Sequence, residues 1–256
     1  MTRLSSIPAY DDILPIIAKF KKAEEIEHLK SLQNGLVYMN RLGIYKKIEE
    51  LEGKQGVGDR YDGHVVVREI RNIHLRNIET DQIIEMGSAG GFTFAFDDVL
   101  AMPVFCSYGI DSSKLEIIDE DENRFTVELR FDSDEIERII RDFGEYALLI
   151  NFSEFKNQLS RVIKEDNHSL IGKMVKYADY SVNQYERLAD KDTINTAFWK
   201  SDVFSHQNEY RLVIPSLNID NPITINIGDL KENSQIYSVS DLVKNPLSFS
   251  LPKLPS

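Results

Sequence analysis

The sequence has one cysteine, Cys106, and one tryptophan, Trp199, among 256 residues. A single cysteine excludes an intrachain disulfide and a cysteine zinc cage. No apolar run approaches the roughly 20 residues that a membrane-spanning helix needs, and the first residues show no secretory signal pattern. The five histidines lack a metal-ligand spacing such as His-x-x-x-His. We therefore expect a cytoplasmic protein that neither crosses a membrane nor carries a metal.

Cations are scarce, with 30 Lys and Arg against 42 Asp and Glu, so the formal net charge is −12. This balance argues against broad capture of nucleic acid or of an anionic membrane. Residues 111–145, however, contain 13 acids against five Lys and Arg, and so hold −8 of that charge. Residues 60–76 are the one basic stretch and include Arg68 and Arg71. The sequence thus predicts a local basic surface, unless those arginines pair with the acidic 111–145 segment.

Hydrophobic residues make up 42% of the chain, which suffices for a sizeable core. Helical spacing of apolar residues alternates with short β-like runs, which predicts one α+β domain over residues 1–256. Strands are predicted at 16–21, 36–39, 65–84, 103–108, 146–151, 174–177 and 209–214. Helices are predicted at 23–32, 45–51, 134–143, 154–163 and 185–199. Glycine loops are predicted at 53–63 and 87–91, and edge strands with a loose tail at 216–256.

The most distinctive stretch is a polar turn that delivers Glu209 at the start of the apolar strand 209–214. Period-two alternation places Glu209 and Arg211 on one face of this strand, opposite Tyr210. Gln207 lies on the same side as Glu209 if the chain is extended there. Two interpretations follow, an edge strand with a Glu–Arg ion pair or a carboxylate presented for chemistry.

With this stretch and others in matching order, the chain resembles a bacterial family whose fold is similar to that of ADP-ribosyltransferases. The shared pieces are 16–21, 24–32, 35–40, 58–63, 104–108, 144–150, 175–179, then Lys200 and Gln207-x-Glu209-Tyr210-Arg211. No single piece is specific, and the ordered set is more specific than any of its parts. The resemblance implies an ADP-ribosyltransferase-like fold, with split mixed or antiparallel sheets flanked by helices.

The resemblance also implies an NAD-dependent ADP-ribosyltransferase that acts as a toxin or an anti-phage defence effector. Cleaving the glycosidic bond of NAD develops oxocarbenium character, which a carboxylate at a strand start stabilises. Glu209 matches that catalytic position, and Gln207 matches the residue that selects the acceptor. A Gln both donates and accepts hydrogen bonds, which suits an amide or a nucleobase edge. Together with the basic stretch at residues 60–76, this favours a nucleic acid, RNA first, over protein as the acceptor.

Four further residues are expected to bind NAD. Lys19 matches a position that contacts the ribose or phosphate, where the family commonly has Arg or His. Tyr38 matches an aromatic that stacks on nicotinamide, and Ser107 and Tyr108 match a supporting Ser/Thr motif. The structural alternatives are a solvated strand-edge lysine and half-buried strand residues.

Acceptor binding is expected to involve Trp199, His206, Arg68 and Arg71 as well as Gln207. Trp199 either stacks on an acceptor base or anchors its loop in the core. His206 either assists proton transfer or is solvated. Arg68 and Arg71 would contact nucleic-acid phosphates.

Other functions remain open. A non-catalytic module of the same fold, binding a nucleotide or a partner protein, is the alternative. A magnesium nuclease using Asp59, Asp62 or Glu209 is disfavoured because no strand carries an Asp followed by a spaced Glu-x-Lys. Asp59 and Asp62 are instead expected to form turns. A toxin of this class would also need a neutralising antitoxin protein.

Overall fold

The computed structural model describes residues 2–11, 13–52, 58–191 and 193–254. Its main element is a large antiparallel sheet in which β10, β13, β6, β2, β9 and β15 follow one another, while β3 joins β6 and β14 joins β3. These strands are β2 (Ile16–Lys21), β3 (Leu36–Arg41), β6 (Pro103–Ile110), β9 (Tyr146–Asn151), β10 (Ile171–Met174), β13 (Glu209–Val213), β14 (Ile223–Asn226) and β15 (Ser234–Ser238).

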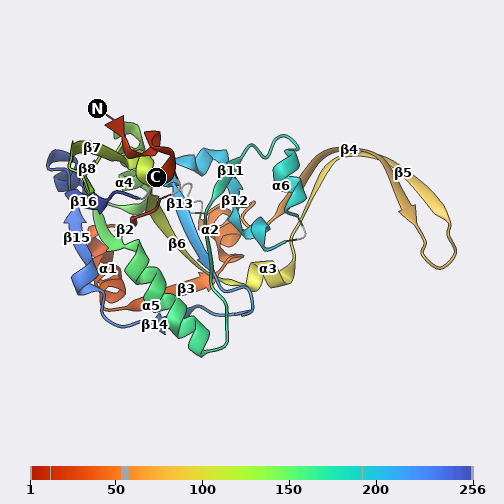
Figure 1. Cartoon of the computed structure of the whole chain (residues 1–256). Helices are drawn as coiled ribbons and strands as arrows, with labels where there is room; N and C mark the ends of the chain where they lie inside the picture. The colour runs from red at the N-terminus through yellow and green to blue at the C-terminus, as the bar shows by residue number, and fades with distance from the viewer. Residues whose placement is uncertain (1, 12, 53–57, 192, 255–256) are drawn as a thin grey trace.

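Helices α1 (Ile26–Gln33) and α5 (Phe152–Glu165) cover one face of the large sheet (Figure 1). Leu29 of α1 and Phe155 of α5 are buried there in one cluster with Leu148 and Tyr210. Asn151 caps α5, because its side chain accepts a hydrogen bond from the Glu154 main chain. This face is the apolar side of the strand that begins at Glu209.

Helices α4 (Ser133–Phe143) and α7 (Val239–Lys244) pack on part of the opposite face. Acids in the first turn of α4 suit the positive end of the helix dipole. The helix ends at Gly144, with φ of 117°. A Cβ there would lie 2.2 Å from the main-chain nitrogen of Lys22, so only glycine fits. Gly144 thereby lets α4 lie close to β2.

Both ends of the chain enter a second, four-stranded antiparallel sheet, in the order β1-β7-β8-β16. Its strands are β1 (Thr2–Arg3), β7 (Leu115–Glu120), β8 (Arg124–Leu129) and β16 (Ser248–Pro252). The Tyr10 hydroxyl donates to the Pro252 carbonyl at 2.9 Å and accepts from the Leu254 main chain at 2.6 Å. The prediction of a loose C-terminal tail is therefore wrong as far as Leu254.

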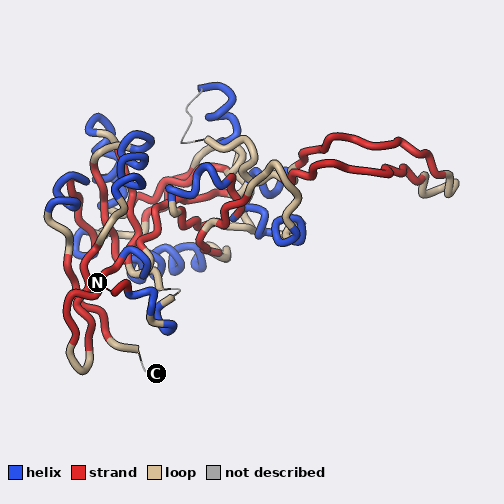
Figure 2. Tube along the Cα trace, turned by 90° about the horizontal axis from the view of Figure 1, so that it is seen from above, coloured by secondary structure: helices blue, strands red, loops and turns tan. Residues whose placement is uncertain are grey.

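Strands β4 (Val65–Arg76) and β5 (Ile83–Phe94) form a two-stranded ribbon that projects far from the rest of the molecule (Figures 1 and 2). At its root, Val66 packs with Ala178, Tyr180 and Trp199. The loop predicted at 87–91 is wrong, because these residues lie within β5, where Ala89 pairs with Ile70. The remaining pair, β11 (Lys176–Ala178) and β12 (Trp199–Ser201), is parallel.

The structure confirms the α+β class, because every sheet except the parallel β11–β12 pair is antiparallel and helices pack on the large sheet. The helix predicted at 185–199 is wrong, since α6 (Tyr185–Ala189) ends after five residues and Ile194–Phe198 is a 3-10 helix. Asp190 accounts for the break, because its carboxylate accepts from the Trp199 indole and the Asn195 amide, both at 2.9 Å.

The other helices are α2 (Ile44–Glu52) and α3 (Asp97–Ala101). Of the loop predicted at 53–63, residues 53–57 lie outside the described residues. Among the helices that the structure describes, none is long and apolar enough to cross a bilayer.

Candidate functional site

The site lies where the large sheet splits. Strand β2 pairs with β6 only from Ile16 to Ala18, and β3 joins the same edge of β6 only at Asn40 and Arg41. Between these two pairings the Lys19 ammonium donates to the Cys106 carbonyl at 2.5 Å. The opening is a pocket of about 170 Å³, lined by β2, β6, α4 and the segment that leads into β13. A split in the sheet thus creates a polar hollow beside its central strands.

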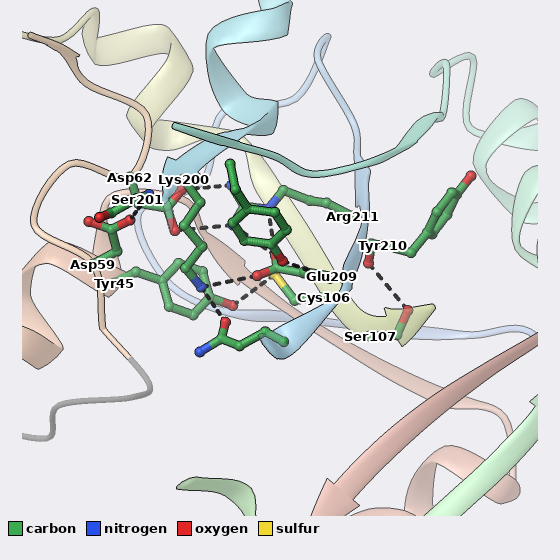
Figure 3. A network of polar contacts seen from close by, with 12 residues as sticks. Tyr45, Asp59, Asp62, Cys106, Ser107, Lys200, Ser201, Glu209, Tyr210 and Arg211 are labelled. Carbon is green, nitrogen blue, oxygen red and sulfur yellow. Dashed lines mark hydrogen bonds and ion pairs between the residues drawn. The ribbon is translucent and has the colours of Figure 1, made fainter. Parts of the chain in front are cut away.

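Glu209 is the acidic centre of this pocket, and only 5% of it is exposed (Figure 3). One carboxylate oxygen accepts from Lys200 Nζ at 3.0 Å, and the other accepts from Arg211 Nε at 2.8 Å. Lys200 also donates to Gln207 Oε1 at 2.7 Å. One buried ammonium therefore holds both Gln207 and Glu209 in place.

Behind Glu209 the fully buried Arg211 guanidinium binds Asp62 through two hydrogen bonds, of 2.7 and 3.1 Å. It also donates to the Ala197 carbonyl at 2.6 Å. Three residues before Asp62, Asp59 accepts from the Ser201 main chain at 2.9 Å. The loop before β4 therefore contacts Arg211 directly through Asp62. Through Asp59 it also contacts Ser201, the residue that follows Lys200.

The charges in this cluster reinforce one another. Burial alone would raise the pKa of the Glu209 carboxyl, but Arg211 and Lys200 outweigh it and hold that pKa well below its usual range. Burial would lower the pKa of Lys200, but Glu209 and Asp62 raise it. Glu209 is therefore a carboxylate and Lys200 an ammonium at neutral pH.

The neighbouring groups stay protonated. Burial, followed by the charge of Glu209, raises the pKa of the Cys106 thiol to about 11. Burial also raises the pKa of Tyr45 well above its usual value, and the Tyr45 hydroxyl lies 3.4 Å from Cys106 Sγ. The pocket wall is thus neutral at this point, next to a carboxylate that can only accept hydrogen bonds.

Five of the residues predicted from the sequence come together in this pocket: Lys19, Ser107, Tyr108, Gln207 and Glu209. The expected alternation of Glu209 and Arg211 against Tyr210 is confirmed. Ser107 Oγ donates to the Tyr210 carbonyl at 3.2 Å, and the Tyr108 hydroxyl donates to Glu135 at 2.9 Å. Both hydroxyls therefore have protein partners.

The other predicted residues lie elsewhere. Tyr38 is 57% exposed on β3, away from the pocket, because its neighbours Val37 and Met39 take the buried side of the strand. Trp199 is buried and donates to Asp190, which matches the anchoring interpretation rather than base stacking.

Neither arginine proposed for the acceptor lines the pocket. Arg68 donates to the Tyr180 carbonyl and the Tyr61 hydroxyl at the root of the ribbon, and Arg71 is exposed further along β4. His206 faces Asp142 of α4 at 2.9 Å. The expected acceptor-binding set is therefore dispersed, with only Gln207 in the pocket.

No local sequence signal marks the part played by Asp62. Asp62 lies in the expected turn, with its main chain donating to the Asp59 carbonyl at 3.0 Å, but its carboxylate is also the buried partner of Arg211. Asp59 does form the expected turn, by accepting from the Tyr61 main chain. The edge-strand interpretation of β13 is wrong, because β13 lies between β10 and β6, although the Glu209–Arg211 ion pair that it implied is present.

The free energy of unfolding should fall in acid because the Glu209 carboxylate becomes protonated. Because the pKa of Glu209 is lower in the folded chain than the value of about 4.3 expected when unfolded, its charge stabilises the fold above about pH 4.3. That contribution is lost as the pH falls further. Urea unfolding of the wild type and of Glu209→Gln, each at neutral and at acidic pH, should show a flatter pH dependence in the variant. Equal pH dependence would contradict this assignment.

Within the described ranges, no three His, Cys, Asp or Glu side chains lie close enough together to hold a metal ion. Comparison with models of protein families, with curated proteins and with solved structures finds no match for this chain.

Proposed function

We propose that this protein is an NAD-dependent ADP-ribosyltransferase in which Glu209 is the catalytic carboxylate. The observation that carries the proposal is the geometry around Glu209, a buried carboxylate at the start of a strand. Lys200 donates hydrogen bonds to both Glu209 and Gln207, and Lys19 lines the same pocket. A carboxylate kept ionised in a place of low dielectric stabilises a developing cation more strongly than it would in water.

The proposed reaction uses this arrangement. The bond between C1′ of the ribose and the nicotinamide nitrogen breaks, and nicotinamide leaves with the electron pair, which neutralises its ring. Glu209 stabilises the positive charge on the ribose and accepts from a ribose hydroxyl. A nucleophilic atom of the acceptor then bonds C1′ and releases its proton to solvent.

The pocket accommodates only one end of such a substrate. Its 170 Å³ is less than the roughly 300–1,000 Å³ of most small-molecule sites. We assign it to the nicotinamide riboside end, with the remainder of NAD lying across the opening. Gln207 borders the pocket, where an acceptor would approach.

The direct test is to incubate the protein with labelled NAD and separate pools of RNA, DNA and protein. Nicotinamide release together with label on RNA is the expected result for a toxin or defence effector of this type. Label on protein alone would show that the acceptor is a protein and not a nucleic acid. No release of nicotinamide with any pool would reject the enzyme.

A non-catalytic binding module is the second candidate, because both oxygens of Glu209 already have cationic partners. Under this alternative Glu209 and its cationic partners form part of a nucleotide-binding site and take no part in catalysis. Saturable NAD binding without nicotinamide release would identify it.

Lys19→Met should raise the KM for NAD by about tenfold, which corresponds to about 1.4 kcal/mol, with little change in kcat. An ammonium has three donors, and only one is needed for the Cys106 carbonyl, so Lys19 can also bind a phosphate oxygen. Steady-state kinetics of nicotinamide release would measure the effect. Lys22→Met, an exposed neighbour beyond β2, is the matched control. A wild-type KM in Lys19→Met would remove Lys19 from the binding site.

A further inference from the structure

The parallel pair of β11 and β12 contacts Glu209 at two separate points. Tyr177 of β11 and Lys200 of β12 lie directly opposite each other in the register, so their side chains project to the same face. The Tyr177 hydroxyl accepts a hydrogen bond from the Glu209 main-chain nitrogen at 2.9 Å, and the Lys200 ammonium donates to the Glu209 carboxylate at 3.0 Å (Figure 3). One strand pair therefore holds both the main chain and the side chain of this residue.

The rest of the strand pair is fixed in the protein. Ala178 and Trp199 are buried with Val66 at the root of the β4–β5 ribbon. Val175, the residue before β11, donates its main-chain N–H to the Glu209 carbonyl at 2.8 Å. The pair is thus a support with its own core contacts, against which Glu209 is held.

Lys200 also determines which way the Gln207 amide points. Only 3% of Lys200 is exposed, and its ammonium donates to Gln207 Oε1 at 2.7 Å. An ammonium has donors and no acceptor, so the amide nitrogen cannot replace Oε1 beside it. Gln207 therefore turns its oxygen toward the lysine, and any hydrogen bond that it makes to an incoming acceptor group is donated from Nε2.

Tyr177 holds the main chain as a neutral phenol. Burial, followed by the charge of Glu209, raises the pKa of Tyr177 well above its usual value. Its oxygen therefore accepts the Glu209 N–H without placing a second negative charge beside the carboxylate. Tyr177 and Lys200 thus fix different parts of the site, and of the two only Lys200 contacts Gln207.

We propose that Tyr177 and Lys200 are positioning residues for ADP-ribosyl transfer, Tyr177 acting through Glu209 alone and Lys200 acting through both Glu209 and Gln207. This inference rests on the proposed function. A displacement of about 1 Å can cost about a hundredfold in rate, so a residue that fixes a reacting group affects the rate without touching the substrate. Cleavage of NAD should depend on both residues, whereas delivery to the acceptor should depend on Lys200.

Water competes with the acceptor, and this competition separates the two roles. When no acceptor atom is in place, a water oxygen bonds C1′ and releases a proton to solvent, which gives free ADP-ribose. The ratio of label on the acceptor to label in free ADP-ribose therefore reports how well the acceptor is positioned. This ratio does not depend on how much of the protein is folded, so a merely structural role would not change it.

The experiment uses labelled NAD and the acceptor pool that the wild type labels. Lys200→Met should lower nicotinamide release by about ten- to a hundredfold and should also lower the ratio at least about threefold. Tyr177→Phe removes one hydrogen bond, so it should lower release by about two- to tenfold and leave the ratio unchanged. In a Gln207→Ala background, Lys200→Met should not lower the ratio further, because the lysine acts on the acceptor through Gln207.

Two neighbours provide matched controls. Tyr180 is also buried, but its hydroxyl has no hydrogen-bond partner in the described part of the chain, so Tyr180→Phe should leave rate and ratio unchanged. Lys176 is an exposed lysine of β11, and Lys176→Met should do the same.

The possible failures are distinguishable. A wild type that releases no nicotinamide would reject the enzyme and this inference with it. An active wild type whose rate and ratio are matched by both Tyr177→Phe and Lys200→Met would overturn the positioning roles and leave the proposed function standing. An equal fall of the ratio in both variants would reject the assignment of Gln207 to Lys200 alone.

Discussion

Replacing Glu209 with Gln is expected to lower the rate of nicotinamide release from NAD by about a hundred- to a thousand-fold. The amide keeps the size of the side chain but removes the negative charge that, in the proposed reaction, faces the ribose in the transition state. Because that charge matters more in the transition state than in the bound substrate, kcat should fall more than KM changes. Release of nicotinamide under saturating NAD measures this directly.

The variant also leaves Lys200 and Arg211 without their shared anion, so loss of folding must be separated from loss of chemistry. Rates should be compared at a temperature where circular dichroism shows both proteins folded. Glu116→Gln is the matched control, because it removes a carboxylate that is 13% exposed and paired with Arg130, far from the pocket. A folded Glu209→Gln protein that releases nicotinamide at the wild-type rate would remove the carboxylate from the mechanism.

The largest loss of stability is expected from Arg211→Met. Methionine fills much of the volume but leaves the buried carboxylates of Asp62 and Glu209 without the guanidinium between them. Breaking a buried ion pair in this way costs about 3–5 kcal/mol. For a chain of this size the melting temperature should fall by roughly 6–20 °C. Calorimetry at neutral pH would record the shift.

The control for this prediction is an arginine in an exposed ion pair. Arg76→Met, which separates a solvent-exposed pair with Asp81, should cost no more than about 1 kcal/mol. Combining Arg211→Met with Asp62→Leu should cost less than the sum of the two single changes, because the second removes one of the stranded charges. Strictly additive effects would mean that Asp62 and Arg211 are not energetically coupled.

Local pattern accounts for much of the site. The alternation along 209–214 correctly assigned Glu209 and Tyr210 to opposite faces, because this depends only on the two-residue repeat of a strand. Tyr38 could have been excluded in the same way, since Val37 and Met39 take the buried side. Asp62 could not be assigned, because it meets Arg211 across 149 positions of the chain and no local signal marks such a contact.

The ribbon of β4 and β5 shows another limit of local pattern. The glycines at 87, 90 and 91 indicate a loop when taken alone. In the structure Gly87 pairs with Ile73 and Gly91 pairs with Arg68 of β4, and Asn72 takes the left-handed conformation at the register irregularity between Ile70 and Ile73. The partner strand, rather than the glycines, determines the structure of this segment.

The four-stranded sheet joins the first and last described residues of the chain, and this affects the order of folding. Strand β16 completes the sheet beside β8, and Tyr10 holds the segment from Pro252 to Leu254. During synthesis the sheet cannot close until residues 248–252 have left the ribosome. Contacts of such long sequence separation also form slowly. The nascent chain therefore carries an unpaired β8 edge until residues 248–252 have been synthesised.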